Sequence, residues 1–403
     1  MQSSSPDRLL IPILSACNFV IGMGAFLVIG MLEPLGQDLA QTPAQIGQLM
    51  TIYAIAYAVL SPLTVALTGQ IGRRRVLAAG LVLFLVSALL AAAAPGFGTL
   101  GLSRVFAAAG AGMFTPVAAA VAAALYPVEQ RAKVLAAVFF GLTVAQVAGV
   151  PAGSFVAYTF GWRWAFGIVA VLCLPGIFLI WTRVPAGLRF QPVALGDLAD
   201  TLSDLRMMLA ITFTGSFIGT SYVLFTYIAP LLSETMGFGR DGVTFILMMF
   251  GVGGVGGNIL GGVLADRFGW RRTLTGLCVA QMLLMPLFSL LPIPSVLLAG
   301  LAVVWAVFGW SFMAGQQMRL INCAGPRAPV VLALNAAAIY VGAALGSAAG
   351  GLVIAHLGLG ALGVFGGLGA ALALVHVTFS AKYPPPCRLA FRPHLADQRQ
   401  SHS

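Results

Sequence analysis

The sequence predicts an all-α polytopic membrane protein in which twelve transmembrane helices form two pseudo-symmetric six-helix bundles. Of the 403 residues, 60% are hydrophobic and only 8% are charged, with a mean hydropathy of +0.98. Such a chain cannot cover its surface with polar groups, so most of that surface must face lipid. A charged loop, 261–272 (GGVLADRFGWRR), also has a weaker copy at 67–75 (LTGQIGRRR), with Gly72 standing 197 positions before Gly269. The repeat predicts two related halves.

Charged residues divide the chain into apolar stretches of membrane-spanning length. Eight stretches free of charge, each holding one segment of roughly 20 residues, are 9–32, 39–72, 76–103, 105–128, 134–162, 164–182, 207–233 and 242–265. Two longer stretches, 273–318 and 328–381, are interrupted by turn sequences at 291–294 (LPIP) and 356–360 (HLGLG), so each holds two helices. The first apolar stretch is too long for a cleaved signal sequence and is expected to be a helix.

The basic residues predict the orientation and the boundary between the halves. Threading twelve spans leaves all but Arg104, Arg163 and Arg240 of the 21 Lys and Arg residues on the side of the N-terminus. That side is therefore expected to be the cytoplasm, with both termini there. The predicted organisation is an N-terminal bundle at 1–184, a polar cytoplasmic linker at 185–206, a C-terminal bundle at 207–381 and a cytoplasmic tail at 382–403.

The duplication is also visible away from the charged loops. Pro34 corresponds to Pro230 and Gly161 to Gly358, and the run 149–153 (GVPAG) corresponds to 346–350 (GSAAG). All these pairs have an offset of 196 or 197 positions, as parallel six-helix repeats require.

These residues resemble the major facilitator superfamily, and within it the twelve-helix drug:proton antiporter branch, which also contains sugar and nucleoside exporters. The stretch 262–272 matches the loop motif G-x-L-A-D-R-x-G-x-R-R of that family. The resemblance implies that an acid at a helix end, flanked by arginines, bridges to the neighbouring bundle and holds one conformation. The alternative is that these charges only anchor the helix at the membrane interface. The implied gating residues are Gly72, Arg74, Gly262, Asp266, Arg267, Gly269, Arg271 and Arg272.

Two further segments carry the resemblance. Arg104 matches an arginine that the family carries in helix 4. A guanidinium buried there requires a carboxylate, carbonyl groups or water as partners. The alternative is that the Arg104 side chain extends to the membrane interface. The run 141–153 (GLTVAQVAGVPAG) is similar to the helix 5 motif of antiporters in the family. There Gly149 and Gly153 permit close helix packing, and Pro151 is expected to bend the helix.

The chain departs from the family pattern at two acidic positions. Gly69 replaces the acid of the first loop motif, with Gln70 after it, and Ala25 replaces a glutamate that many relatives carry in helix 1. An intramembrane carboxylate is the usual proton carrier. Glu33 is therefore the coupling candidate, with Arg104 as its expected partner. Asp38 and Glu234 are interpreted as solvated, and the alternative is transport without a proton.

A solute cavity between the bundles should be largely apolar, with a few polar groups that orient the solute. Polar and aromatic residues on helices that line the cavity in this family are Asn18, Tyr53, Tyr57, Gln146, Tyr222, Tyr227, Asn258, Trp305, Gln316, Gln317, Asn335 and Tyr340. Any single aromatic among them is also explained by packing alone. Arg104 is the one cation expected inside the cavity, so the predicted solute is neutral or weakly charged and partly apolar.

The sequence therefore predicts a secondary transporter that exports a drug-like, sugar-like or nucleoside-like solute in exchange for protons. An uncoupled facilitator or an importer is the alternative. A membrane enzyme is not expected, because His356 and His376 are isolated, and neither a metal site nor a cofactor is expected from the five scattered cysteines. The sequence has no P-loop motif (G-x-x-x-x-G-K-[ST]), so export driven by ATP bound to this chain is not expected. The net charge of +10 is explained by membrane topology and not by nucleic acid. The protein is expected to be a monomer in the cell (inner) membrane.

Overall fold

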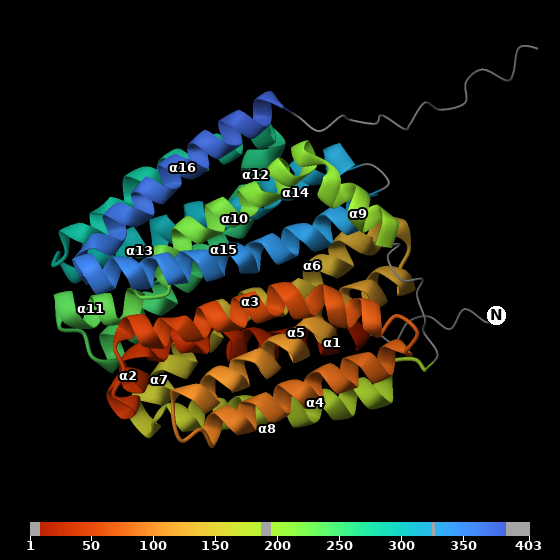
Figure 1. Ribbon diagram of the computed structural model, residues 1–403, viewed down its shortest axis with the longest axis horizontal. Coiled ribbons are helices and arrows are strands. Elements are labelled where there is room, and N and C mark those ends of the chain that lie inside the picture. The colour runs from red at the N-terminus through yellow and green to blue at the C-terminus, as the bar shows by residue number, and fades with distance from the viewer. Residues whose placement is uncertain (1–8, 187–194, 325–326, 384–403) are drawn as a thin grey trace, which may run out of the picture.

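A computed structural model describes residues 9–186, 195–324 and 327–383, and it consists of long, roughly parallel helices in two halves (Figure 1). In the N-terminal half the helices are α1 (Leu10–Phe26), α2 (Leu32–Leu39), α3 (Pro43–Leu67), α4 (Arg73–Ala92), α5 (Phe97–Leu125), α6 (Val128–Val144), α7 (Val150–Phe160) and α8 (Trp162–Arg183). A 3₁₀ turn, η1 (Leu27–Met31), joins α1 to α2, and a π-helical turn, η2 (Ala145–Gly149), joins α6 to α7.

The C-terminal half repeats this arrangement after a short linker helix. Its helices are α9 (Leu195–Ser203), α10 (Leu205–Phe225), α11 (Ile228–Met236), α12 (Arg240–Leu284), α13 (Ser295–Trp310), α14 (Phe312–Ala324), α15 (Ala328–Leu357) and α16 (Leu362–Lys382), with 3₁₀ turns η3 (Met285–Leu290) and η5 (Leu359–Ala361). The side chain of Asp204 accepts a hydrogen bond from the Met207 amide (3.1 Å) and caps the start of α10. The predicted linker thus contains a helix and ends two residues earlier than expected.

The structure confirms the predicted membrane fold. Within the described residues, eleven helical stretches are long and apolar enough to cross a bilayer. One of them, Arg240–Leu290, has 51 residues and holds two spans, which gives twelve. The two spans are separated at Gly269, whose φ of 74° lies outside the range that other residues readily adopt. Gly161 and Gly358, matched in the sequence repeat, both end helices with a positive φ.

Two basic residues are almost completely buried inside helices. Arg104 lies about two turns inside α5, which begins seven residues earlier at Phe97, in agreement with its assignment to helix 4. Arg319, which was counted with the cytoplasmic loops, is fully buried in α14. A span defined by the absence of charge ends at each of these residues, although the helix continues past it.

The internal repeat extends to backbone packing. Gly22 on α1 lies against Ala145, where an added Cβ atom would lie 2.8 Å from the alanine Cβ. Gly219 and Gly342, both 197 positions further on, bring α10 against α15, and a Cβ on Gly219 would lie 3.1 Å from the Gly342 carbonyl oxygen. Small residues therefore allow the same close helix contact in each half.

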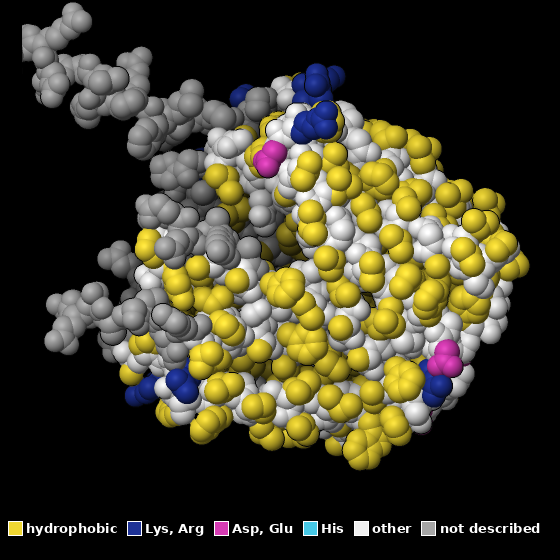
Figure 2. Space-filling view, turned by 180° about the vertical axis from the view of Figure 1, so that it is seen from behind, with side chains coloured by type: hydrophobic (Ala, Val, Ile, Leu, Met, Phe, Trp, Pro, Cys, Tyr) yellow, Lys and Arg dark blue, Asp and Glu magenta, His cyan; other side chains and the backbone are white. Residues whose placement is uncertain are grey.

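The surface has the polarity of a protein embedded in lipid. Figure 2 shows hydrophobic side chains spread over most of the visible face, with charged side chains near its margins. Large apolar side chains are widely exposed, among them Phe178 (67%), Leu372 (73%) and Trp164 (65%). Soluble monomers rarely expose apolar surface on this scale.

The orientation of the spans remains a prediction that cysteine labelling tests. Gln37 and Arg75 are both exposed, near opposite ends of the helices. In intact cells an impermeant thiol reagent is expected to label Gln37→Cys and not Arg75→Cys, because basic loops stay in the cytoplasm. Permeabilised cells provide the control, since both variants should then react. Labelling of position 75 alone in intact cells would reverse the topology.

Candidate functional site

The two halves meet along a seam in which α3 packs on α15, and α7 with η2 packs on the first part of α12. The Thr51 hydroxyl donates to the Ala344 carbonyl across this seam (3.4 Å). Gly251 lies against Val147, and Gly351 lies near the Ala44 carbonyl. These contacts lie towards the end that the predicted topology places outside the cell, called the external end below.

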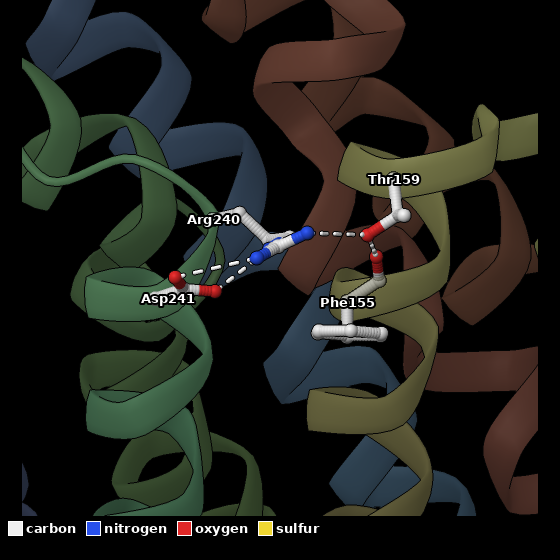
Figure 3. A network of polar contacts seen from close by, with 4 residues as sticks. All are labelled: Phe155, Thr159, Arg240 and Asp241. Carbon is white, nitrogen blue, oxygen red and sulfur yellow. Dashed lines mark hydrogen bonds and ion pairs between the residues drawn. The ribbon is translucent and has the colours of Figure 1, made fainter.

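An exposed polar contact joins the halves at the external end. Arg240 begins α12 and donates a hydrogen bond across the seam to the Thr159 hydroxyl of α7 (3.2 Å) (Figure 3). Its guanidinium also pairs with Asp241 (2.7 Å) and lies 4.8 Å from the centre of the Phe155 ring. The halves are therefore in contact towards this end by apolar packing and by hydrogen bonds from Thr51 and Arg240.

A tyrosine cluster spans the seam below these contacts. Tyr57 of α3 stacks on Tyr340 of α15, with ring centroids 3.7 Å apart, and Tyr53 lies 6.2 Å from both rings. Tyr222 of α10 and Arg104 are close enough to Tyr53 to interact electrostatically. The Tyr53 hydroxyl is buried and has no hydrogen-bond partner. A buried hydroxyl without a partner is costly and can be satisfied by a polar group of a bound solute.

Gln146 provides a second buried polar group at the seam. It lies in η2 and borders a narrow cleft with Thr143, Val147, Phe250, Gly251, Gly254 and Trp310. Its Oε1 atom is buried and lacks a donor. The π turn follows from Pro151, which cannot donate the next helical bond, and the Val150 amide instead bonds to the Ala145 carbonyl five residues back. Such turns are frequent at functional sites because they reorient side chains.

The glycines of the same segment contact α1. An added Cβ would lie 3.2 Å from the Met23 side chain at Gly149 and 3.1 Å from Leu27 Cβ at Gly153. The backbone distortion predicted at Pro151 lies just before it, in the π turn. The segment therefore fixes α1 and presents Gln146 to the other half.

The structure does not bring the two predicted coupling residues together. Arg104 is 1% exposed, donates to the Gly24 carbonyl (2.8 Å) and lies 4.9 Å from the Phe166 ring centre. Glu33 instead accepts hydrogen bonds from Tyr158 (2.8 Å) and Gln37 (3.3 Å). Gly24 precedes Glu33 by nine residues, roughly 13 Å of helix, so Arg104 finds its partner well short of Glu33. The expected ion pair is therefore wrong for this conformation, as is extension of Arg104 to the interface.

Three predicted cavity residues instead join helices within one half. The Asn18 amide donates to the Val138 carbonyl (3.0 Å) and accepts from Thr115 (3.0 Å). In the C-terminal half, Thr214 bonds to Asn335, and Gln316 donates to Thr214 (2.9 Å) and to the Ala210 carbonyl (2.8 Å). Val138 and Asn335 are equivalent in the repeat. These amides therefore form matched networks inside the two halves.

The remaining cavity candidates differ in their surroundings. Trp305 donates to Gln281 (2.6 Å) and joins α13 to α12, while Tyr227 donates to the Ser347 carbonyl (2.8 Å). Both are buried in packing, whereas Asn258 and Gln317 are exposed. The sequence analysis missed Gln281, although an amide within an apolar helix indicates a buried partner.

The second loop motif folds into an exposed turn. The Thr273 hydroxyl donates to the carbonyls of Leu264 (3.0 Å) and Gly269 (2.9 Å) and so closes the turn. Gly262 is half-buried, whereas Asp266, Arg267, Arg271 and Arg272 are exposed. Asp266 is absent from the ion pairs of the described residues. A bridge from Asp266 to the other half stays a prediction for another conformation.

The first loop motif has a different geometry. Gly72 has a φ of −57° and precedes the start of α4, so this copy does not use the positive φ of Gly269. The Arg74 guanidinium lies 4.9 Å from the Trp181 ring centre and donates to the Trp181 carbonyl (3.4 Å). The first copy thus contacts its own half through an aromatic side chain.

Two six-span halves that enclose unpaired polar groups at their seam define a membrane transporter. The chain belongs to the Major Facilitator Superfamily, whose family model matches residues 14–328. It is 33% identical over 369 residues to the inner membrane transport protein YdhP of Escherichia coli K12, covering 91% of this chain and 94% of that protein. It is 30% identical over 381 residues to a chloramphenicol resistance protein of Streptomyces lividans, covering 92% and 95%.

Solved structures show the same fold. A D-xylose-proton symporter aligns with a TM-score of 0.73 at 17% identity, covering 94% of this chain and 98% of that one. A bacterial homologue of the lysosomal transporter Spinster, in an inward-facing and unoccupied conformation, aligns with a TM-score of 0.69 at 17% identity, covering 93% and 95%. Membership of the family, with the spans described above, makes the protein a multi-pass membrane transporter of a small-molecule solute.

Proposed function

We propose that this transporter exports a small, neutral or weakly charged, partly apolar solute in exchange for protons, by alternating access. The observation that carries the proposal is the seam, where aromatic rings surround a hydroxyl at Tyr53 and an amide oxygen at Gln146 that have no partners. Aromatic faces suit an apolar ring, and the two polar atoms suit hydroxyl or amide groups of a solute. The proposed protein is a monomer in the bacterial inner membrane, with both termini in the cytoplasm.

We assign the conformation as inward-facing. The described contacts across the seam, from Arg240–Thr159 to Tyr57–Tyr340, lie between the external end and the middle of the membrane. A solute would then enter the seam from the cytoplasm. Export follows when the halves rock and the external contacts open.

Glu33 supports proton coupling at the external end. Its carboxyl group is partly buried and accepts from Tyr158, next to the seam at which Thr159 contacts Arg240. Opening of the external contacts would change the surroundings of Glu33 and its hydrogen bond with Tyr158. A facilitator without protons, or an importer, is the alternative.

Flux of radiolabelled chloramphenicol into inside-out vesicles tests the proposal. An exporter that exchanges protons is expected to accumulate the compound when the vesicle interior is acidic, and accumulation should stop when an ionophore removes the gradient. Glu33→Gln is expected to abolish gradient-driven accumulation and to preserve counterflow exchange, because the solute site is intact. Glu234→Gln, an exposed carboxylate near the external end of α11 in the other half, is the control. Equal gradient-driven accumulation in Glu33→Gln would remove Glu33 from the coupling.

A further inference from the structure

A polar cluster lies inside the C-terminal half, near the predicted cytoplasmic ends of α10 and α16. At its centre is His376 of α16, whose Nδ1 atom lies 2.8 Å from the Ser216 hydroxyl and whose Nε2 atom lies 3.0 Å from the Leu209 carbonyl. Both partners belong to α10. The expectation that His376 is isolated is therefore wrong, because residues 160 and 167 positions away in the chain contact its ring.

The partners of the ring determine where a proton can be added. A backbone carbonyl only accepts hydrogen bonds, so Nε2 carries a hydrogen and donates it to Leu209. In the neutral ring Nδ1 then has a free lone pair and accepts from the Ser216 hydroxyl. Nδ1 is therefore the atom that binds an additional proton, and it already faces a group that can act as either donor or acceptor.

The cluster can satisfy the charged ring without moving a helix. When Nδ1 is protonated it donates to the Ser216 oxygen, and the serine hydrogen turns to the Thr212 carbonyl, which lies 3.4 Å away. Leu209 continues to accept from Nε2. Leaving a buried polar group unpaired would cost about 1–3 kcal/mol, and neither protonation state of His376 incurs that loss.

A second cation lies beside the cluster. Arg319 of α14 donates to the Ser380 hydroxyl (2.7 Å), one turn beyond His376 on α16. The Phe213 ring contacts both groups, with its centre 5.8 Å from the imidazole and 5.9 Å from the guanidinium carbon. Two thiols lie nearby: Cys278 of α12 belongs to the hydrophobic cluster around Phe213, and Cys323 of α14 is close enough to Arg319 to interact with it electrostatically.

The groups at the helix ends complete the surroundings. Arg206 and Lys382 are exposed near the ends of α10 and α16, and no carboxylate pairs with Arg319 or His376 among the described residues. Partial burial of the ring and, to a smaller extent, Arg319 oppose a proton on His376, whereas the hydrogen bonds of the ring favour it. That balance favours reversible loading over permanent charge.

We propose that His376 is a proton-binding site of the C-terminal half, loaded and unloaded from the cytoplasmic side at Nδ1, with the Ser216 hydroxyl reversing its hydrogen bond. Its place on the cytoplasmic side complements Glu33, which lies towards the external end. A role of His376 in the transport cycle rests on the proposed exchange of solute for protons. Proton binding by His376 itself does not depend on that exchange.

Nitrogen NMR of the full-length protein in lipid nanodiscs, with ¹⁵N-labelled histidine, tests proton binding directly. His376→Gln identifies the signal, and His356→Gln, at the exposed end of α15, is the matched control. At about pH 8 the His376 signals should be those of the neutral Nε2–H form, and they should convert to those of the charged ring as the pH falls to about 5. A ring that is neutral at pH 5, or protonated on Nδ1 when neutral, would contradict the proposal.

Ser216 variants test the hydrogen-bond reversal. Ser216→Ala removes the acceptor that the charged ring needs, so the pH of half-protonation should fall by about 0.5–1 unit, because hydrogen bonds to charged groups are stronger than neutral ones. Ser216→Thr keeps the hydroxyl and should restore the wild-type value. The same value in all three proteins would exclude Ser216 from proton binding.

Transport measurements then separate the two proposals. In vesicles, His376→Gln should lose at least about tenfold of the chloramphenicol accumulation driven by a pH gradient, equivalent to 1.4 kcal/mol, and keep counterflow exchange. Full gradient-driven accumulation in this variant would exclude a role in coupling. If the wild-type protein shows no gradient-driven accumulation, proton exchange with this solute fails, and the NMR titration still decides whether His376 binds a proton.

Discussion

Arg104→Met is expected to stop transport and to leave the protein folded, with a thermal unfolding midpoint at or above that of the wild type. The Arg104 guanidinium is 1% exposed, pairs with one carbonyl and has an Nε atom without a partner. A buried charge that lacks a carboxylate costs folding free energy, and an apolar side chain of similar volume can restore about 1–4 kcal/mol. Because this cation also lies close to Tyr53, its loss should lower transport at least about tenfold.

Thermal unfolding of purified protein and chloramphenicol flux in vesicles measure the two effects of Arg104→Met. Leu102→Met, on the same helix but half exposed on its outer surface, is the matched control and should change neither. A midpoint several degrees below the wild type would show that Arg104 holds α5 against α1, and normal flux would show that the transport cycle does not need the charge.

Gly346→Leu is expected to prevent assembly of the C-terminal half. A Cβ atom at this position would overlap the Gly219 carbonyl oxygen of α10, so α10 and α15 would have to separate. Separation of two packed backbones loses dispersion contacts along both helices, and we expect a destabilisation of at least about 3 kcal/mol. The fraction of monodisperse protein after detergent extraction is the measurement. Gly276→Leu, where nothing lies within 4 Å, is the control and should be neutral or slightly stabilising.

The membrane fold could be predicted because its signals are local. Runs of apolar residues show where a helix crosses a bilayer, and the repeat of Gly72 at Gly269 and of Gly161 at Gly358 relates the halves without any knowledge of contacts. Arg319 was assigned to a cytoplasmic loop for the same reason. An isolated charge marks a span boundary in a sequence, whereas a helix in a folded bundle can surround it with carbonyls and rings.

The site was predicted only in part, because uniformly apolar helices do not show which face meets which neighbour. Tyr57 and Tyr340 were both candidates, but their stacking joins positions 283 apart in the chain. Asn18 and Trp305 were cavity candidates for the same reason, but their contacts lie within one half. His376 was dismissed because its partner Ser216 is distant in the sequence, and such a partner is revealed only by tertiary structure.

The glycine contacts inside each half have a consequence for how the substrate range can change. Where Gly219 meets Gly342, and where Gly22 meets Ala145, backbones touch and no side chain can be altered without displacing a helix. At the seam Gly251 also lies against the Val147 backbone, but other contacts are made by side chains such as Tyr57, Gln146 and Arg240. Substitutions there alter the shape and polarity offered to a solute while the two rigid bodies stay intact. Single substitutions at the seam can therefore change which solute is bound, while each variant protein still folds.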